Sequence, residues 1–461
     1  MKVAILSNVT AQVLADMLSG EFDVWTSVSF DTWFQDSLSP PEELKAFAPD
    51  RILLLVDGRH CASGASVARA AEALAGHFPK AVVAAPDLKA LADDMGESFY
   101  DERMWAFAKM PWSKVALEEL MKFARPKKIA AIDFDGVLWR GVIGEDGVAG
   151  VTMNVDFQRR LKALKERGIV LIGLTKNNPC DIALVWKSAR MALEEGDFVR
   201  IAAGWEEKSV NLAAAARELN LSLDSVVFFD DSPVERAKMR SACPEVCVAP
   251  FPFADIDAYF PGGGSSREDA SRTEFYKADL ERRKLADALS LERYFAELEI
   301  RVRPLDLGAS DAARLAQLSQ KTNQFNINPK RYSQSQVLSF LEDKTRKIFA
   351  FSAEDKFGDY GTISFVNYKI DGDEAFCEDF VMSCRAMGRT IEFAIEEFAE
   401  KSLAAAGIKK INAIWKRTGR NEPVRKLFEN FGFSLECDSG DEKRYSVSLP
   451  RSAAFAKRCS L

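Results

Sequence analysis

Histidine is almost missing from this sequence, in which only His60 and His77 occur among 461 residues. Catalysis by a serine–histidine or cysteine–histidine pair in the last three-quarters of the chain would need one of these imidazoles delivered from the N-terminal region. We therefore expect carboxylates and thiols to supply most of the chemistry.

Other absences narrow the class of protein. The sequence has no apolar run of membrane-spanning length, and its eight cysteines show neither zinc-ligand spacing nor the framework of a secreted disulfide protein. The net charge of −7 argues against general nucleic-acid binding. The first residues, MKVAILSNVT, are typical of a strand rather than a signal peptide. These features predict a cytoplasmic protein with no nucleic-acid partner and no membrane span.

The most informative segment is IAAIDFDGVLWRGVIGEDG, residues 129–147. A short apolar run ends in Asp133 and Asp135, which face the same side of a strand because strand side chains alternate. Open α/β sheets bind their ligands at the carboxyl ends of strands. Two carboxylates in one pocket repel each other unless a cation relieves them, and the usual cation is Mg²⁺ in phosphoryl chemistry.

Three further segments follow in order: VLIGLTKNN (170–178), GWEEKSVNLAAAAREL (204–219) and SVVFFDDSP (225–233). The first and third are predicted strands, and the second is a predicted helix. They place polar side chains at strand ends and at the helix start, namely Thr175, Lys176 and Asn177, then Lys208, then Asp230 and Asp231.

This ordered set of acid pair, hydroxyl, lysine and acid pair resembles the four motifs of the haloacid dehalogenase (HAD) superfamily. The resemblance implies a Mg²⁺ site made by four aspartates, namely Asp133, Asp135 through its backbone carbonyl, Asp230 and Asp231. Asp133 would also be the nucleophile on phosphorus and Asp135 the general acid/base. Thr175 and Lys208 would hold phosphoryl oxygens, and Asn177 would contact the substrate. Taken singly, Thr175 and Lys208 could be a turn hydroxyl and a solvated charge.

The N-terminal region, residues 1–125, is predicted to form a small α/β layer with strands at 2–6, 51–56 and 81–84. Ser7 lies where hydrolases of the SGNH type carry their nucleophile. The Asp-x-x-His that such enzymes need is absent, and the corresponding region is SFYDERMWAFAKMPWS. We expect an SGNH-like interaction or scaffold domain here rather than a second catalytic one.

Three further parts follow along the chain. Residues 126–260 are predicted to form a HAD-type, Rossmann-like parallel sheet, and 261–298 a glycine-rich linker followed by a charged helix from Thr273 to Leu298. The last part, 299–450, is predicted to be an α+β domain with these elements: strands at 347–351, 361–367, 375–382 and 410–415, and a helix at 389–406.

Within that last part, the turn MSCRAMGRTIEFAIEEF resembles the Arg/Gln-x-x-Gly-x-Gly/Ala loop of GNAT acyltransferases through Arg385, Gly388 and Arg389. In that loop, backbone N–H groups at a helix N-terminus hold the pyrophosphate of coenzyme A. Thr390 replaces the small residue expected there. Asn421 and VRKLFENFGF (424–433) match the second GNAT signature.

The combination of these parts resembles the FkbH-like family of HAD subfamily IIIC. The blocks that carry the resemblance are DFDGVLWRGVIGEDG, GLTKNN, WEEKSVNL, FFDDSPVER, KTNQFNINPKRYS, DKFGDYGTIS and FVMSCRAMGRTIE. The family pattern implies transfer of a D-glyceryl unit from 1,3-bisphosphoglycerate, a phosphorylated three-carbon acyl donor, to the thiol of an acyl carrier protein in secondary-metabolite (polyketide) biosynthesis. The chain departs from the pattern at Gly136-Val137, where Asn-Thr is common, and at Ser232, where Asn is common.

Two elements of the last part are candidates for the acyl half of this reaction. Cys384 lies beside Arg385 near a predicted helix start, and both influences lower the pKa of a thiol. It is the candidate relay thiol, although a cysteine at the end of an apolar strand could equally be buried packing. Asn323, Phe325 and Asn326 could line a channel for a phosphopantetheine arm, or they could form an Asn-rich turn after a helix.

Several alternatives stay open. The acceptor could be a sugar amine or hydroxyl in surface polysaccharide synthesis, or the chain could be a plain small-molecule phosphatase. The chain could also be a non-catalytic assembly protein. All acidic positions of the HAD-like motifs are filled, which disfavours this alternative. A basic docking patch for an acidic carrier protein could be made by Lys409, Lys410, Lys416, Arg417 and Arg420, or these could be ordinary solvated residues.

Overall fold

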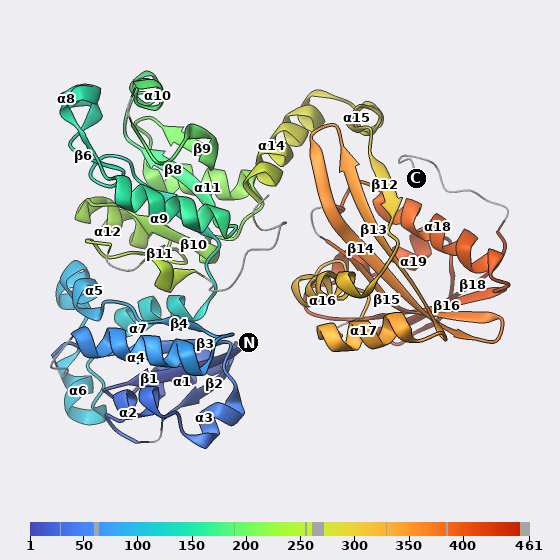
Figure 1. The fold of residues 1–461 in the computed structure, drawn as a ribbon, viewed down its shortest axis with the longest axis horizontal. Coiled ribbons are helices and arrows are strands. Elements are labelled where there is room, and N and C mark those ends of the chain that lie inside the picture. The colour runs from blue at the N-terminus through green and yellow to red at the C-terminus, as the bar shows by residue number, and fades with distance from the viewer. Residues whose placement is uncertain are drawn as a thin grey trace. The chain divides into compact units, whose positions relative to one another are not determined.

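The computed structural model describes residues 1–27, 29–59, 64–188, 190–253, 256–260, 272–328, 330–383 and 386–451. Its chain forms two compact units, Met1–Lys277 and Ala278–Leu461 (Figure 1). The glycine-rich linker expected over 261–271 lies outside the described residues. Among the helices of the described ranges, none combines the length and the apolar character needed to cross a membrane.

The first layer of unit 1 is a parallel sheet in the order β2-β1-β3-β4. Its strands are β1 (Lys2–Ser7), β2 (Asp23–Thr26), β3 (Arg51–Leu55) and β4 (Val82–Ala84). Its helices are α1 (Gln12–Ser19), α2 (Trp33–Leu38), α3 (Glu42–Phe47), α4 (Gly64–His77), α5 (Leu88–Met95), α6 (Glu102–Ala108) and α7 (Lys114–Met121), with short 3₁₀ turns at Gly96–Ser98 and Lys122–Ala124. The Ser7 hydroxyl accepts a hydrogen bond from the Val9 amide at 3.2 Å, and the His77 ring contacts the Leu38 carbonyl at 3.0 Å. Each of these two groups therefore has a local structural partner.

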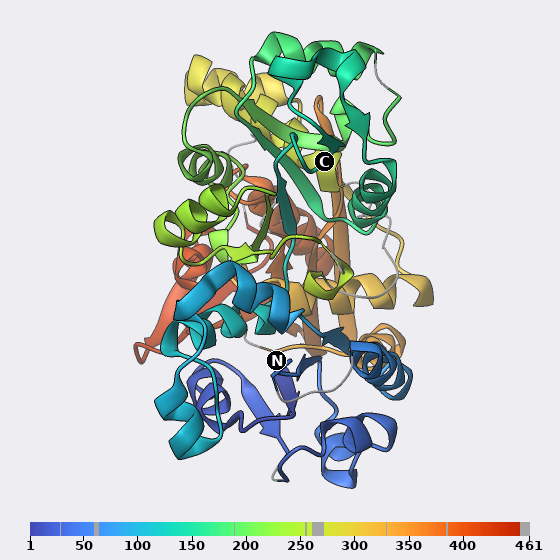
Figure 2. The same ribbon diagram turned by 90° about the vertical axis from the view of Figure 1, so that its left-hand side faces the viewer.

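The second layer of unit 1 is a parallel sheet in the order β11-β10-β5-β8-β9. Figure 2 shows this layer in green next to the first layer in blue. The strands of the second layer are β5 (Ile129–Ile132), β8 (Val170–Thr175), β9 (Phe198–Ala203), β10 (Val226–Phe229) and β11 (Cys247–Val248), and a small hairpin pairs β6 (Trp139–Arg140) with β7 (Thr152–Met153). The helices are α8 (Ile143–Gly150), α9 (Val155–Glu166), α10 (Pro179–Ser188), α11 (Lys208–Glu218) and α12 (Pro233–Ala242), with 3₁₀ turns at Glu195–Asp197, Leu223–Ser225 and Asp257–Tyr259. The strands predicted to end at Asp133, Thr175 and Asp230 are confirmed.

One hydrophobic core joins the two layers of unit 1. It contains Trp112 of the first layer and Phe229 of the second, and Phe123 packs on Tyr259 with ring centroids 5.2 Å apart. Arg51 is buried between the layers, where its guanidinium donates to the carbonyls of Phe123, Ala258 and Tyr259. Burial without a carboxylate partner lowers the pKa of Arg51 to about 10. The two layers therefore pack as one body.

Unit 2 is built on a mixed sheet in the order β12-β13-β14-β15-β16-β18-β17. Its strands are β12 (Arg301–Pro304), β13 (Arg346–Asp355), β14 (Gly358–Asp371), β15 (Glu374–Met382), β16 (Lys410–Lys416), β17 (Ser434–Asp438) and β18 (Glu442–Ser448). Its helices are α14 (Arg272–Ala288, which begins in unit 1), α15 (Leu291–Leu298), α16 (Ala312–Lys321), α17 (Gln334–Glu342), α18 (Ile391–Ala405) and α19 (Leu427–Asn430), with 3₁₀ turns at Ala309–Asp311 and Glu422–Val424. The single charged helix expected from Thr273 to Leu298 is instead two helices, because Ser290 has an extended backbone (φ −64°, ψ 155°). A buried ion pair of Arg282 with Asp355, at 2.7 and 2.9 Å, ties α14 to the sheet.

The sheet of unit 2 opens between its two parallel strands. β15 pairs with β16 only over Glu374–Cys377 and Lys410–Ala413. Beyond these pairs, the segment Phe325–Asn328 lies between the strands. Its backbone hydrogen bonds reach both of them, from Met382 N to Phe325 O (3.0 Å), from Ile327 N to Phe380 O (3.4 Å) and from Lys416 N to Ile327 O (2.9 Å). The chain itself therefore fills the opening.

Candidate active site

Three adjacent strands of the second layer end in the residues that the sequence singled out. In the order β10-β5-β8, the strands lead to Asp230, Asp133 and Thr175, all of them buried. Lys208 begins α11, and its ammonium lies 2.9 Å from the Asp133 carboxylate and 2.7 Å from that of Asp230. The predicted acid pair, hydroxyl, lysine and acid pair therefore meet at one edge of the sheet.

The carboxylate oxygens of Asp133, Asp230 and Asp231 lie within 4.8 Å of one another. Oxygen ligands from carboxylates are those that Mg²⁺ prefers, so this group fits the cation that the sequence implies. The Asp135 carboxylate is not part of this group, and the contact of its backbone carbonyl with a metal stays a prediction. Asp230 is held in place because its Oδ1 accepts the Ser232 amide hydrogen at 2.9 Å.

The electrostatics of the group reflect its burial. Loss of solvent raises the pKa of Asp133 to about 7, and the neighbouring Asp230 adds to this, while Lys208 opposes it. Burial also raises the pKa of Asp230. Burial alone would lower the pKa of Lys208, but the two carboxylates outweigh it and the net pKa is raised. A cation at these carboxylates would favour their charged forms.

The Asp135 carboxylate accepts hydrogen bonds from three donors. Its Oδ1 accepts hydrogen bonds from the Trp139 indole at 2.7 Å and the Ile143 amide at 3.1 Å. Its Oδ2 accepts one from the Asn177 side chain at 2.7 Å, and the same Asn177 nitrogen lies 2.9 Å from the Thr175 hydroxyl. This network fixes the carboxylate that the sequence assigns as general acid/base.

Gly136 allows the loop after β5 to approach the metal group. Its φ of +72° lies in the left-handed region, which favours glycine. A Cβ at this position would lie 2.0 Å from Asp231 Oδ2. This close approach therefore requires glycine at this position.

Sequence reasoning missed two residues that support the site. Arg236 of α12 donates through Nη1 to the backbone carbonyls of Asp230 (2.7 Å) and Asp231 (2.8 Å). Its other side pairs with the buried Asp94 of α5, in the first layer. No local spacing connects residues so far apart in the chain, so the sequence held no signal for this pair.

In the loop that resembles a GNAT loop, the contacts of Arg389 are with the protein itself. Arg389 is mostly buried, forms an ion pair with Asp279 at 2.7 Å and packs over the Tyr360 ring. It therefore stabilises unit 2, and its charge is already paired. Gly388 and Thr390 have left-handed backbones, with φ of +74° and +59°. Cys384 and Arg385 lie outside the described residues.

The three residues proposed to line a channel divide into two groups. Phe325 is buried and packs on Phe380 with ring centroids 5.4 Å apart, so it belongs to the core. Asn323 and Asn326 do line a cavity, which lies after α16. A thioester arm entering the sheet between β15 and β16 would have to displace the segment Phe325–Asn328.

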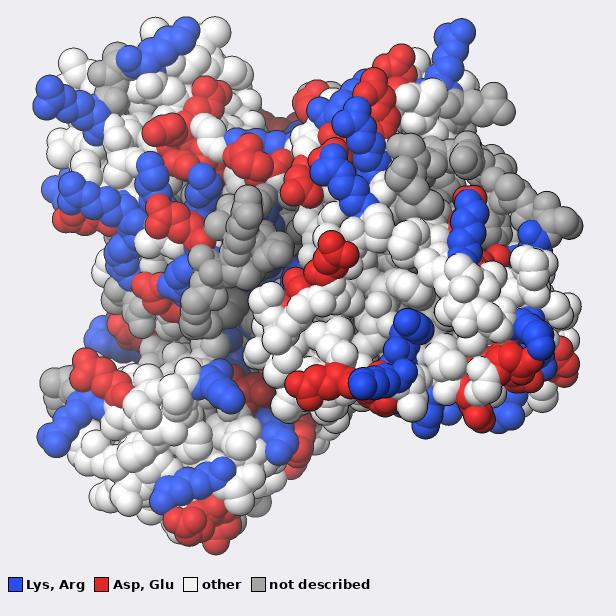
Figure 3. Space-filling view, turned by 45° about the vertical axis from the view of Figure 1, so that its right-hand side comes forward, with Lys and Arg blue, Asp and Glu red and all other residues white. Residues whose placement is uncertain are grey.

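The candidate basic patch is largely neutralised by acidic neighbours. Lys409 pairs with Asp373 at 3.0 Å, and two further pairs join Lys416 to Glu442 (3.4 Å) and Arg417 to Asp441 (3.7 Å). Figure 3 likewise shows acidic and basic side chains interspersed over the visible face. These contacts favour ordinary solvated residues over a docking patch.

Several solved structures are similar to parts of this chain. The N-terminal part of the Bacteroides fragilis protein BF1531, which contains a phosphatase domain and is complexed with Mg, is 20% identical, with a TM-score of 0.31, and covers 56% of this chain and 91% of its own. The ribosomal-protein-S18-alanine N-acetyltransferase of Escherichia coli is 12% identical, with a TM-score of 0.26, covering 34% and 99%. The PaiA N-acetyltransferase of Thermoplasma acidophilum, in complex with coenzyme A, is 15% identical, with a TM-score of 0.25, covering 32% and 98%.

No family model matches the sequence, and no curated protein matches it. The structural similarities are too distant to carry a functional argument. The assignment of function therefore depends on the geometry of the site in unit 1.

Proposed function

We propose that this chain is a Mg²⁺-dependent phosphatase of the HAD type, coupled to acyl transfer. One observation supports the phosphatase half of this proposal. Three carboxylates lie close together with Lys208, at the carboxyl ends of the strands that also lead to Thr175. Asp133, Asp230 and Asp231 would hold Mg²⁺, which when bound supplies positive charge against the phosphate. An anionic nucleophile can approach an anionic phosphate only under such screening.

The residues of the chain divide the chemistry between them. One Asp133 oxygen attacks phosphorus and forms an aspartyl phosphate, and Asp135 gives a proton to the departing oxygen. Asp135 then takes a proton from the water that cleaves the aspartyl phosphate, which restores both residues. Lys208 and the Thr175 hydroxyl hold phosphoryl oxygens during both steps. The three hydrogen bonds to Asp135 support this role because they fix its position.

The second half of the proposal concerns the acyl group. The family resemblance favours a D-glyceryl unit taken from 1,3-bisphosphoglycerate and passed through the Cys384 thiol to the thiol of an acyl carrier protein. The carbonyl of the acyl phosphate forms a thioester with the cysteine as phosphate leaves, and the remaining phosphate ester is hydrolysed at the Asp133 site. A sugar amine or hydroxyl is the alternative acceptor.

Intact-protein mass tests both halves at once. The wild type, Asp133→Asn and Cys384→Ala are incubated with Mg²⁺ and freshly generated 1,3-bisphosphoglycerate. We expect a glyceryl adduct on the wild type, a phosphoglyceryl adduct on Asp133→Asn and no adduct on Cys384→Ala. A plain phosphatase would give a different pair of results. The wild type and Cys384→Ala would release phosphate at an equal rate without any adduct, and the product would be the free acid even when a carrier protein is present. No phosphate release by the wild type would overturn the whole proposal.

A further inference from the structure

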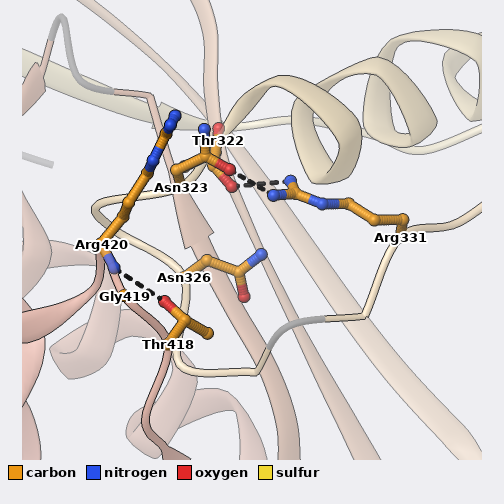
Figure 4. A pocket seen from close by; sticks show the side chains of 7 residues that line it. All are labelled: Thr322, Asn323, Asn326, Arg331, Thr418, Gly419 and Arg420. Carbon is orange, nitrogen blue, oxygen red and sulfur yellow. Dashed lines mark hydrogen bonds between the residues drawn. The ribbon is translucent and has the colours of Figure 1, made fainter. Parts of the chain in front are cut away.

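Unit 2 contains a cavity of about 310 Å³ that the proposed phosphatase does not use. It lies between the segment that follows α16 and the loop that follows β16 (Figure 4). Its lining residues are Thr322, Asn323, Asn326, Arg331, Thr418, Gly419 and Arg420. A cavity of this volume is at the small end of the range for small-molecule sites.

Asn326 is one of two buried polar residues that line this cavity, and Thr322 is the other. The Asn326 side chain is 3% exposed, and its Oδ1 accepts the Asn328 amide hydrogen at 3.0 Å. Its backbone carbonyl accepts a hydrogen bond from the buried Asn421 at 2.9 Å, which fixes the residue. No acceptor among the described residues takes the hydrogens of its side-chain nitrogen, which points into the cavity in Figure 4. This nitrogen is open to the cavity, and it would pair there with a ligand that accepts hydrogen bonds.

The other polar groups around the cavity are also arranged as donors. Arg331 donates to the carbonyls of Ser319, Gln320 and Thr322 and to Asn323 Oδ1. Because the Asn323 oxygen is taken in this way, its amino group is left to donate. Thr418 Oγ1 accepts the amide hydrogens of Arg420 (3.3 Å) and Asn421 (3.1 Å), which leaves its hydroxyl hydrogen to donate.

The charge of the cavity is positive. Two arginines line it, and no Asp or Glu is among its lining residues. Arg420 differs from its neighbour Arg417, which pairs with Asp441, because no acidic residue in the described ranges pairs with the Arg420 guanidinium. An anion placed here would meet a guanidinium whose charge is not already neutralised.

We propose that this cavity binds a phosphate group. A carboxylate offers two oxygens, whereas the amides, hydroxyl and guanidinium on the cavity wall supply enough donors for the three terminal oxygens of a phosphate monoester. The phosphate could belong to a small phosphorylated substrate or to a phosphopantetheine arm. The inference goes beyond the proposed phosphatase, since none of the cavity residues belongs to unit 1.

The test is calorimetric titration of the full-length chain with inorganic phosphate in EDTA, at constant ionic strength. Asn326→Asp keeps an oxygen for the Asn328 amide but replaces the donor with a negative charge, and Arg420→Gln removes the unpaired guanidinium. We expect each change to raise the Kd of phosphate at this site at least tenfold. Arg417→Gln, the matched surface control, is expected to stay within twofold of the wild type. Because Arg420 is exposed, its variant carries the test if Asn326→Asp fails to fold.

Each outcome decides the proposal. Equal phosphate binding by all four chains would overturn it, and so would acetate binding as tightly as phosphate at the same site. Loss of activity in the Asp133 site would not affect these titrations, so the two proposals fail separately. Titration with glycerol 3-phosphate and with 4′-phosphopantetheine then distinguishes the two sources of the phosphate. The ligand that binds more tightly is assigned as the source, and either result supports the site.

Discussion

The Arg236 guanidinium joins the Asp94 carboxylate to the loop that carries Asp230 and Asp231. Its Nε and Nη2 lie 2.8 and 2.5 Å from Asp94 Oδ1, although 142 residues separate the two in the sequence. Arg240 donates to the other Asp94 oxygen. The first layer of unit 1 therefore supplies the counter-charge for an arginine that donates to the backbone carbonyls of Asp230 and Asp231 in the second layer.

Asp94→Asn tests this relationship. Removing the charge leaves two arginines without their buried partner, and we expect a loss of about 3–5 kcal/mol in stability. We also expect the Mg²⁺ concentration for half-maximal phosphatase activity to rise several-fold, because Arg236 no longer holds the two carbonyls in place. The adjacent Asp93→Asn is the control, since Asp93 is exposed and pairs with Lys89. An unchanged Mg²⁺ dependence in a destabilised Asp94→Asn would show that the pair is structural only.

Gly136→Ala should displace Asp231. The new Cβ would lie 2.0 Å from Asp231 Oδ2 and would force a left-handed backbone on alanine. We expect at least a tenfold loss of kcat/KM at low Mg²⁺, with partial recovery at high Mg²⁺. Gly144→Ala is the control because the nearest atom to its Cβ, Asn177 Oδ1, is 3.8 Å away. Similar kinetics for the two variants would refute the close-approach argument.

Lys208→Met should make the protein more dependent on Mg²⁺ for stability. Without the ammonium, Asp133 and Asp230 lose the cation that lies 2.9 and 2.7 Å from them. In the absence of Mg²⁺, we expect a loss of about 3 kcal/mol or more. Added Mg²⁺ should then raise the melting temperature more than in the wild type. Calorimetry with and without Mg²⁺ checks this, with Lys238→Met, at an exposed ion pair, as the control. A smaller Mg²⁺ effect in Lys208→Met would contradict the prediction.

Glu396 should make unit 2 less stable as the pH rises. Burial raises its pKa to about 8, and the negative Glu400 adds to this while Arg451 opposes it. Because the pKa in the folded state exceeds that in the unfolded state, the folded protein binds the proton more tightly. The contribution of Glu396 to stability is therefore greatest below about pH 4 and falls until about pH 8. Glu396→Gln should be more stable than the wild type at pH 9, by a few kcal/mol.

Thermal unfolding between pH 5 and 9 measures this difference. Glu397→Gln is the matched control, since Glu397 pairs with Lys401 at 2.6 Å. Parallel pH profiles for Glu396→Gln and the wild type would show that Glu396 does not titrate in this range.

The sequence predicted the centre of the site because the strands that carry it are buried on both faces. The runs 129–132, 170–175 and 226–229 are continuously apolar and end at the functional residues, as is typical of parallel strands. The edge strand β17 could not be found in this way, because all five of its residues are exposed and mostly polar. Asp94 with Arg236, and the segment Phe325–Asn328, depend on contacts between distant parts of the chain, which no local pattern encodes.

The bond between Asp94 and Arg236 also bears on how the first layer can change over evolutionary time. In this layer Ser7 accepts a hydrogen bond from the Val9 amide, and α5 holds Asp94, the partner of Arg236. A substitution of Asp94 in α5 would therefore also affect the loop of the second layer that holds Asp230 and Asp231, because Arg236 contacts both. A shorter chain without the first layer would therefore leave Arg236 without Asp94, beside the loop that holds Asp230 and Asp231.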